Sequence, residues 1–147
     1  PRLLSMIGDY LDALMIDLDD TFDTINRLGM QLSTIYIGGG TPTTLSPKQL
    51  EKLFKKISEH VDVNTLQEFT LEAGRPDTIT EEKLSVAKKY GVTRISVNPQ
   101  TLNDDILRDI GRRHTTNDFY KAYELAKNSG IRDINVDLIA GLPGDDF

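Results

Sequence analysis

The sequence predicts an α/β fold with about four parallel strands, and three observations support this prediction. Segments with helical periodicity alternate along the chain with short runs of β-branched residues. Two similar segments, 90–97 and 129–136, both place a glycine just before a strand, which is typical of stacked strand–helix units. Polar residues follow the strands at the end where parallel sheets bind ligands. A half barrel and a doubly wound sheet are both compatible with this pattern, and no internal linker divides the chain.

The elements can be predicted in order from local signals. Apolar residues recur at helical spacing from Leu3 to Leu28, and Gly29 then provides a natural stop. A β-branched strand follows at 34–37, and the sequence Ser-Pro-Lys-Gln at 46–49 predicts the capped start of a helix over 47–60. The remaining expected elements are a strand near 69–72, a helix over 80–90, a strand at 94–97, helices near 104–110 and 117–128, and a last strand at 134–139. Because crossover helices cover both faces of such sheets, we expect these strands to be apolar apart from functional residues.

Composition indicates a globular domain with no sign of secretion. The chain has 147 residues, of which 38% are hydrophobic and 27% are charged, and it contains no cysteine. One core is therefore expected, and disulfides are excluded. No apolar stretch approaches the ~20 residues that span a bilayer. The net charge of −6 disfavours nucleic acid as a partner. We expect a cytoplasmic protein with neither a membrane span nor a nucleic-acid partner.

One acidic motif resembles a catalytic signature but has a simpler interpretation. The segment Asp17-Leu18-Asp19-Asp20-Thr21 matches the Asp-x-Asp-x-Thr pattern of haloacid-dehalogenase phosphatases. Their chemistry requires the two aspartates at the end of a strand, on a loop that holds Mg²⁺. Here Leu14, Leu18 and Phe22 continue the helical stripe through the segment. We interpret the aspartates as a solvated helix face.

Four strand ends carry polar residues where a strand–helix protein builds its ligand site. They are Gly38-Gly39-Gly40-Thr41, Glu72, Asn98-Pro99-Gln100 and Asp137. Glycines let a ligand approach the backbone, although a tight turn without a ligand explains them equally well. The two carboxylates lie in apolar stretches, so each needs either a ligand hydroxyl or ammonium group or a structural ion pair. The glutamine suits a ribose or a carboxylate, and otherwise it caps the following helix.

An arginine after the third strand completes the candidate set. The planar guanidinium of Arg112 matches a free carboxylate, although a lone arginine is usually solvated. Arg113 lies next to it and could exchange roles with it.

Taken together, the motifs resemble one known family. Its order and spacing are matched over residues 32–147 by Gly38-Gly39-Gly40-Thr41-Pro42-Thr43, Glu72, Asn98-Pro99-Gln100-Thr101, Gly111-Arg112-Arg113-His114 and Asp137-Leu138-Ile139-Ala140-Gly141-Leu142-Pro143-Gly144. In these motifs the chain resembles the radical S-adenosylmethionine (SAM) enzymes of the oxygen-independent coproporphyrinogen III oxidase group. Segments 71–77 and 97–101 are most similar to the coproporphyrinogen dehydrogenase branch of this group in Gram-positive bacteria. The resemblance implies a partial (β/α) barrel.

The resemblance also implies an activity and a set of binding residues. The whole protein would bind SAM and a [4Fe–4S] cluster, take electrons from a donor, and convert propionate groups of coproporphyrinogen III to vinyl groups through a 5′-deoxyadenosyl radical, as a step of haem biosynthesis. No catalytic residue and no metal ligand is assigned within this chain. The implied cofactor-binding residues are Gly39, Gly40 and Thr41 for the methionine part, Gln100 and Asp137 for the ribose hydroxyls, Arg112 for the carboxylate, and Glu72 for a polar group of this or a second SAM molecule.

The chain departs from the family pattern in one respect. Clusters of this kind are held by cysteine thiolates, in a Cys-x₃-Cys-x₂-Cys loop, and this chain has no cysteine. We therefore expect residues 1–147 to be the central part of a barrel domain, truncated at both ends and inactive in isolation. The alternatives are a haem-carrying chaperone of the same superfamily and a generic nucleotide-binding module. The glycine turn lacks the lysine of a P-loop, which disfavours the generic module.

Overall fold

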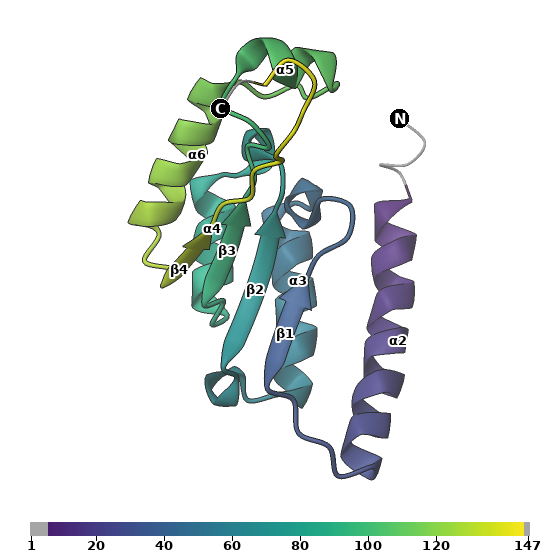
Figure 1. Cartoon of the computed structure of the whole chain (residues 1–147). Coiled ribbons are helices and arrows are strands. Elements are labelled where there is room, and N and C mark those ends of the chain that lie inside the picture. The colour runs from purple at the N-terminus through teal and green to yellow at the C-terminus, as the bar shows by residue number, and fades with distance from the viewer. Residues whose placement is uncertain (1–5, 146–147) are drawn as a thin grey trace.

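The computed structural model of this chain describes residues 6–145, which form a four-stranded parallel sheet backed by helices (Figure 1). The strands are β1 (Thr34–Ile37), β2 (Glu68–Ala73), β3 (Arg94–Val97) and β4 (Asp133–Asn135). The helices are α2 (Ile7–Arg27), α3 (Pro47–His60), α4 (Glu81–Lys89), α5 (Asp104–Asp109) and α6 (Thr116–Asn128), and 3₁₀ turns occur at η1 (Pro42–Thr44), η2 (Val63–Thr65) and η3 (Pro76–Thr78). The strands lie in chain order, β1-β2-β3-β4, and every neighbouring pair is parallel. The predicted α/β fold with four parallel strands is confirmed.

Local signals set the ends of the best-predicted helices. Ser46 caps α3 in a capping box with Gln49, and Pro47 occupies the first turn. At the end of α2, Gly29 adopts a φ of +65°, which closes the helix as predicted. The predicted start of this helix at Leu3 lies outside the described residues. Both helices depend on interactions within a few residues of their ends, which is why the sequence alone predicts them.

The hydrophobic core lies between the sheet and the helices. Phe69, Leu71 and Ala73 of β2 are fully buried on the face that α3 and α4 cover. Their neighbours in the core are Leu50, Leu53, Phe54 and Ile57 of α3, Leu84 and Ala87 of α4, Ile95 and Val97 of β3, and Phe119, Ala122 and Ala126 of α6. The helices thus bury one face of every central strand.

The other face of the sheet is polar, so the prediction of apolar strands with helices on both faces is wrong. Glu68, Thr70 and Glu72 alternate with the core residues of β2, and Arg94 and Ser96 do the same on β3. Within residues 6–145, the helices lie against only one side of the sheet (Figure 1). Successive strand residues point to opposite faces, so each strand has an apolar and a polar side.

The last strand is shorter than the predicted 134–139, because a side chain replaces part of its ladder. β4 ends at Asn135, and the backbone N–H of Asp137 donates to Oδ1 of Asn98 at 3.2 Å instead of to a strand carbonyl. Parallel pairing resumes only as a single bridge between Gln100 and Leu138. The segment after β4 that leaves the ladder carries Asp137, one of the candidate ligand residues.

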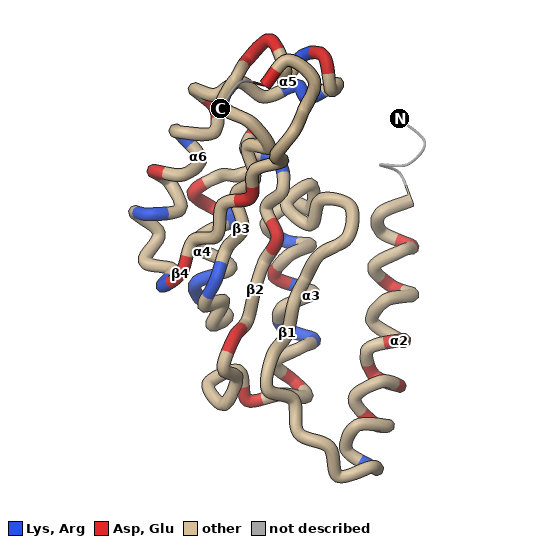
Figure 2. The backbone as a smooth tube through the Cα atoms, viewed as in Figure 1, with Lys and Arg blue, Asp and Glu red and all other residues tan. Residues whose placement is uncertain are grey.

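Opposite charges join the first two described helices, as Figure 2 shows for acidic α2 and its neighbour α3. Nζ of Lys56 lies 3.0 Å from Oδ1 of Asp19, and Nε2 of His60 lies 2.6 Å from the same oxygen. Lys52 also pairs with Asp12. The Asp-x-Asp-x-Thr segment is inside helix α2, which confirms that it is not a phosphatase loop. Asp19 is nevertheless partnered rather than merely solvated.

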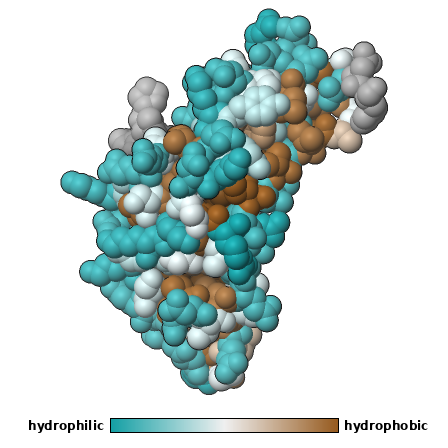
Figure 3. All heavy atoms as spheres, turned by 90° about the vertical axis from the view of Figure 1, so that its left-hand side faces the viewer, coloured by the Kyte–Doolittle hydropathy of each residue, from teal (hydrophilic) through white to brown (hydrophobic). Residues whose placement is uncertain are grey.

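The surface beside β4 is partly apolar. Figure 3 shows brown, hydrophobic side chains on the side of the molecule that α6 and β4 occupy in Figure 1. Val136, Leu138 and Ile139, which follow β4, are all exposed. β4 is also an edge of the described sheet, so its outer backbone groups lack a strand partner. No helix in residues 6–145 combines the length and the apolar character that crossing a membrane requires.

Candidate functional site at the strand ends

The carboxyl ends of the strands gather most of the candidate residues (Figure 1). Gly38–Gly40 follow β1, and the segments containing Gln100 and Asp137 follow β3 and β4. Backbone bonds join these last two segments. The N–H of Gln100 donates to the carbonyl of Asp137 at 3.3 Å, and the carbonyl of Gln100 accepts from Ile139 at 2.8 Å. The structure thus brings together the two residues implied for ribose hydroxyls.

The three glycines after β1 have different reasons to be glycine. A Cβ on Gly38 would lie 2.3 Å from Cε1 of Tyr36 and 2.8 Å from Oε2 of Glu72, so this position makes room for two side chains. Gly39 has a φ of +107°, which the turn requires. Gly40 has neither constraint, because a Cβ there meets nothing within 4 Å and its φ is not positive. Open backbone at this position fits a ligand that approaches the strand end closely.

Glu72 on β2 is partnered by a tyrosine. The hydroxyl of Tyr36 donates to Oε2 of Glu72 at 3.2 Å. Partial burial and the negative charge of Glu72 raise the pKa of Tyr36, since both disfavour the tyrosinate. Within residues 6–145, neither Glu72 nor Asp137 forms a salt bridge, so the described structure contains no ion pair that would explain these carboxylates.

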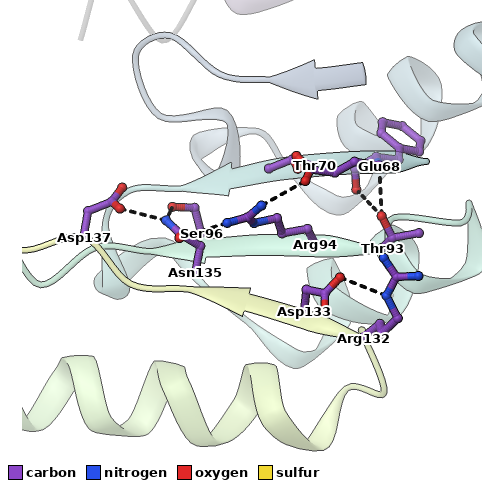
Figure 4. A network of polar contacts seen from close by, with 10 residues as sticks. Glu68, Thr70, Thr93, Arg94, Ser96, Arg132, Asp133, Asn135 and Asp137 are labelled. Atoms are coloured by element: carbon purple, nitrogen blue, oxygen red, sulfur yellow. Dashed lines mark hydrogen bonds and ion pairs between the residues drawn. The ribbon is translucent and has the colours of Figure 1, made fainter. Parts of the chain in front are cut away.

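Asp137 is exposed and is held by an amide. Nδ2 of Asn135 donates to Oδ1 of Asp137 at 2.8 Å. Figure 4 shows this contact as one end of a polar network that crosses β4, β3 and β2. The links of the network are Asn135 to Ser96 (3.3 Å), Arg94 to Asn135 (3.1 Å), Arg94 to Glu68 (2.9 Å) and Thr70 to Glu68 (2.7 Å).

The sequence analysis missed this network, although its signal is present in the sequence. Polar residues recur at every second position along three strands and just past two of them: 68, 70 and 72 on β2, 94 and 96 on β3 with 98 directly after it, and 133 and 135 on β4 with 137 after it. A period of two places such residues on one face of a sheet. The assumption that both faces are buried concealed the pattern.

Gln100 has an unusual backbone conformation. Its φ of +71° is the one positive value among the described non-glycine residues. Left-handed backbone in a residue with a Cβ costs roughly 1–2 kcal/mol. Such conformations cluster at ligand sites, where the surrounding structure imposes them. Here the residue forms a parallel bridge with Leu138 of the segment after β4.

Arg112 lies at the same end of the sheet, after α5. Gly111, with a φ of +75°, ends this helix, and the backbone N–H of Arg112 donates to the carbonyl of Leu107 at 2.8 Å. The arginine is half-buried, and its side chain has no ion pair or hydrogen bond within the described part of the chain. Two residues later, His114 is buried, and its Nε2 lies 3.1 Å from the carbonyl oxygen of Pro99. This contact connects the segment to the end of β3.

A lysine connects the turns that follow β1 and β2. Nζ of Lys83 donates to the carbonyls of Thr43 at 2.6 Å and Thr78 at 2.9 Å. The hydroxyls of these two threonines are 2.6 Å apart. Burial lowers the pKa of Lys83. The glycine turn, with Thr41 at its end, is therefore anchored to the neighbouring strand end by α4.

These features describe an α/β domain with a candidate ligand site at its strand ends, and comparison with known proteins shows its family. The sequence profile of the Radical SAM superfamily matches residues 8–147, and the chain belongs to this superfamily. It is 41% identical over 140 residues to the oxygen-independent coproporphyrinogen-III oxidase-like protein HemZ of Bacillus subtilis, covering 95% of this chain and 28% of HemZ. It is 42% identical over 139 residues to the heme chaperone HemW of Lactococcus lactis, covering 95% of this chain and 36% of HemW.

A solved structure gives the same result for the fold. Coproporphyrinogen III oxidase (HemN) from Escherichia coli, a radical SAM enzyme, matches with a TM-score of 0.84 and 27% identity. The match covers 99% of this chain and 33% of HemN. The chain thus spans about a third of the length of these relatives. Its sheet and helices are those of a radical SAM barrel.

Proposed function

We propose that this chain forms the SAM-binding part of a radical SAM protein of the haem-related HemN, HemW and HemZ group. One observation supports this most: Gln100 and Asp137 are joined by backbone bonds at adjacent strand ends, at the same end of the sheet as the open backbone of Gly40. Ribose hydroxyls both donate and accept hydrogen bonds, so they suit an amide beside a carboxylate.

The described residues fit the parts of SAM as follows. Gly39, Gly40 and Thr41 present backbone groups to the methionine part. The guanidinium of Arg112, which has no ion-pair partner within residues 6–145, suits its carboxylate. Glu72 is available through the carboxylate oxygen that Tyr36 does not contact, for a polar group of this or a second SAM molecule. When bound with an iron–sulfur cluster, SAM supplies radical chemistry. The chain has no cysteine, so its own residues do not fit the cluster.

For the whole protein, the first proposal is oxygen-independent oxidation of coproporphyrinogen III, with loss of CO₂ from propionate groups. HemZ, by its name, and HemN, by its described activity, support this reading. Anaerobic turnover of coproporphyrinogen by the whole protein, followed by mass spectrometry, is expected to show the decarboxylated products. Absence of turnover under conditions where HemN is active would contradict it.

The second proposal is haem delivery, which the similarity to the heme chaperone HemW favours. In that case the whole protein would bind haem stoichiometrically in a spectroscopic titration and would not turn over coproporphyrinogen. The two results separate the proposals, because only the oxidase consumes the porphyrinogen.

SAM binding is tested apart from either activity. In the whole protein with its cluster, Asp137→Asn and Arg112→Met are each expected to weaken SAM binding by roughly tenfold or more. The first replaces a charged acceptor by a weaker neutral one, and the second removes a charged donor. Isothermal titration calorimetry measures the affinity. Arg113→Met is the matched control, since the neighbouring arginine is exposed. Unchanged affinity in both site variants would contradict the proposed site.

A further inference from the structure

We propose that Asn135 is a positioning residue that orients Asp137 toward a ribose hydroxyl. This inference rests on the proposed function, because it specifies how the chain prepares the ribose part of the SAM site. Asn135 ends β4, and Asp137 follows two positions later on the polar side of the sheet. The 2.8 Å bond from Nδ2 to Oδ1 of Asp137 joins the two side chains directly.

The neighbours of Asn135 permit only one orientation of its amide. Nη2 of Arg94 lies 3.1 Å from Oδ1 of Asn135, and a guanidinium can only donate. On the other side, the ionised carboxylate of Asp137 can only accept. The amide satisfies both partners only if its oxygen faces Arg94 and its nitrogen faces Asp137. The orientation therefore follows from the chemistry of the two neighbours.

The network behind Asn135 holds this arrangement in place. Nη1 of Arg94 donates to Oε2 of Glu68 at 2.9 Å. Hydrogen bonds from Thr70 and Arg94 hold the pKa of Glu68 below its ordinary value, so the glutamate is charged at neutral pH. Nδ2 of Asn135 also lies 3.3 Å from Oγ of Ser96. Figure 4 shows that these contacts cross three adjacent strands, so the amide is supported by the sheet itself.

The amide leaves Asp137 prepared for a ligand. Its backbone N–H is held by Asn98 at 3.2 Å, and its Oδ1 by Asn135. Within residues 6–145, Oδ2 has no hydrogen-bond partner, and the residue is exposed. Because the donor is a neutral amide and not the guanidinium of Arg94, Asp137 is oriented without forming an ion pair. Its second oxygen can therefore accept a hydroxyl with its charge uncompensated.

The substitution Asn135→Asp tests this role with little change in shape. A carboxylate at 135 still accepts from Arg94, but it places a second negative oxygen against Asp137. The repulsion removes the orienting bond while the packing is retained. Asn128→Asp, at the exposed end of α6, makes the same chemical change away from the site and is the matched control.

The experiment measures binding of two ligands to the whole protein with its cluster. Isothermal titration calorimetry gives the affinities for SAM and for its 2′,3′-dideoxy analogue, in the unaltered protein, Asn135→Asp, Asp137→Asn and the double variant. We expect Asn135→Asp to weaken SAM binding by roughly tenfold. Asn135→Asp should change the affinity for the dideoxy analogue by no more than about twofold. When Asp137→Asn is already present, Asn135→Asp should likewise change the affinity for SAM by no more than about twofold.

The outcomes separate this inference from the proposed function. If Asp137→Asn leaves SAM binding unchanged, the ribose role of Asp137 fails, and the role of Asn135 fails with it. If Asp137→Asn weakens binding but Asn135→Asp does not, only the inference is overturned. Equal weakening of both ligands by Asn135→Asp would show a general structural role and would also overturn it. The inference is supported if Asn135→Asp weakens binding of SAM but not of the dideoxy analogue, and if it has no further effect once Asp137→Asn is present.

Discussion

Glu72 has a tyrosine hydroxyl beside it, and its only described hydrogen-bond partner within residues 6–145 is therefore a neutral group. The contact at 3.2 Å satisfies one oxygen of the carboxylate and leaves its charge uncompensated by any salt bridge within residues 6–145. Its other oxygen has no hydrogen-bond partner within residues 6–145 and is available to a ligand. Two residue-scale predictions follow from its surroundings.

Replacing Glu72 by glutamine should lower the pKa of Tyr36 toward its ordinary value of 10.0. The negative charge that disfavours the tyrosinate disappears, whereas the partial burial remains. Titration of ¹³C-labelled tyrosine by NMR follows the change. Glu51→Gln is the control, because Glu51 contacts Tyr90 and not Tyr36. An unaltered Tyr36 titration in Glu72→Gln would show that the contact is absent in solution.

Gly38→Ala should destabilise the protein by about 1 kcal/mol, because the new Cβ displaces Tyr36 and Glu72 and breaks their hydrogen bond. Gly40→Ala is the matched control, since its Cβ meets nothing within 4 Å. Urea denaturation of both variants gives the free energies of unfolding. Equal values for the two variants would refute the assignment of different roles to these glycines.

At the scale of elements, α4 anchors the turns that build the site. Lys83 joins the carbonyls of Thr43 and Thr78, and so holds η1 against η3. α2 and α3 are joined in a similar way by Asp19, Lys56 and His60. In both cases a polar side chain determines how two elements meet at the edge of an apolar core.

Lys83→Met should loosen the two turns without unfolding the sheet. We expect amide hydrogen exchange in 42–45 and 76–79 to rise by roughly five- to tenfold, because the methionine cannot bind the two carbonyls. Mass spectrometry of exchanged peptides measures this. Lys88→Met, at an exposed position of the same helix, should leave both turns unchanged. Uniformly faster exchange over the whole chain would argue against a local anchor.

Asp19→Asn should lower the free energy of unfolding at pH 7, and Asp20→Asn, at an exposed position, should not. Hydrogen bonds from Lys56 and then His60 hold the pKa of Asp19 below its ordinary value of 3.8. A lowered carboxyl pKa contributes stability above the unfolded value, and this contribution is lost as the pH falls through the folded value. The difference between Asp19→Asn and the unaltered protein should therefore vanish in acid. Denaturation curves at pH 7 and below pH 3.8 provide the comparison, and a constant difference would contradict the ion pair.

For the molecule as a whole, the sheet supplies polar strand ends but no thiolate. In the described part, four parallel strands carry one helical layer, and their other face is polar. Iron–sulfur clusters are held by cysteine thiolates, and the chain has no cysteine.

We therefore predict that the 147-residue chain forms no stoichiometric iron–sulfur cluster and has no radical activity. Anaerobic reconstitution with iron and sulfide, followed by absorbance in the charge-transfer region, measures this, with HemN as the positive control. Formation of one cluster per chain would overturn the prediction.

Short-range signals made the helices predictable, and also the strand ends at which the candidate residues lie. The capping box of Ser46 and Gln49, the stop at Gly29 and the strand at 34–37 all depend on neighbours in the chain. The same holds for the candidate residues, because a polar residue that follows a β-branched run is placed at a strand end by local geometry alone. Their roles in ligand binding remain predictions.

The sequence by itself determined the α/β class, the order of the elements and the strand ends at which polar residues lie, because each depends on periodicity or capping over a few residues. Only the tertiary structure decided that β4 ends at Asn135 and that this amide connects Arg94 to Asp137. These features require β3 and β4 to lie side by side, and their pairing joins residues about 40 positions apart. The physical reason is that a hydrogen-bond partner across a sheet is chosen by strand register, which no local pattern specifies.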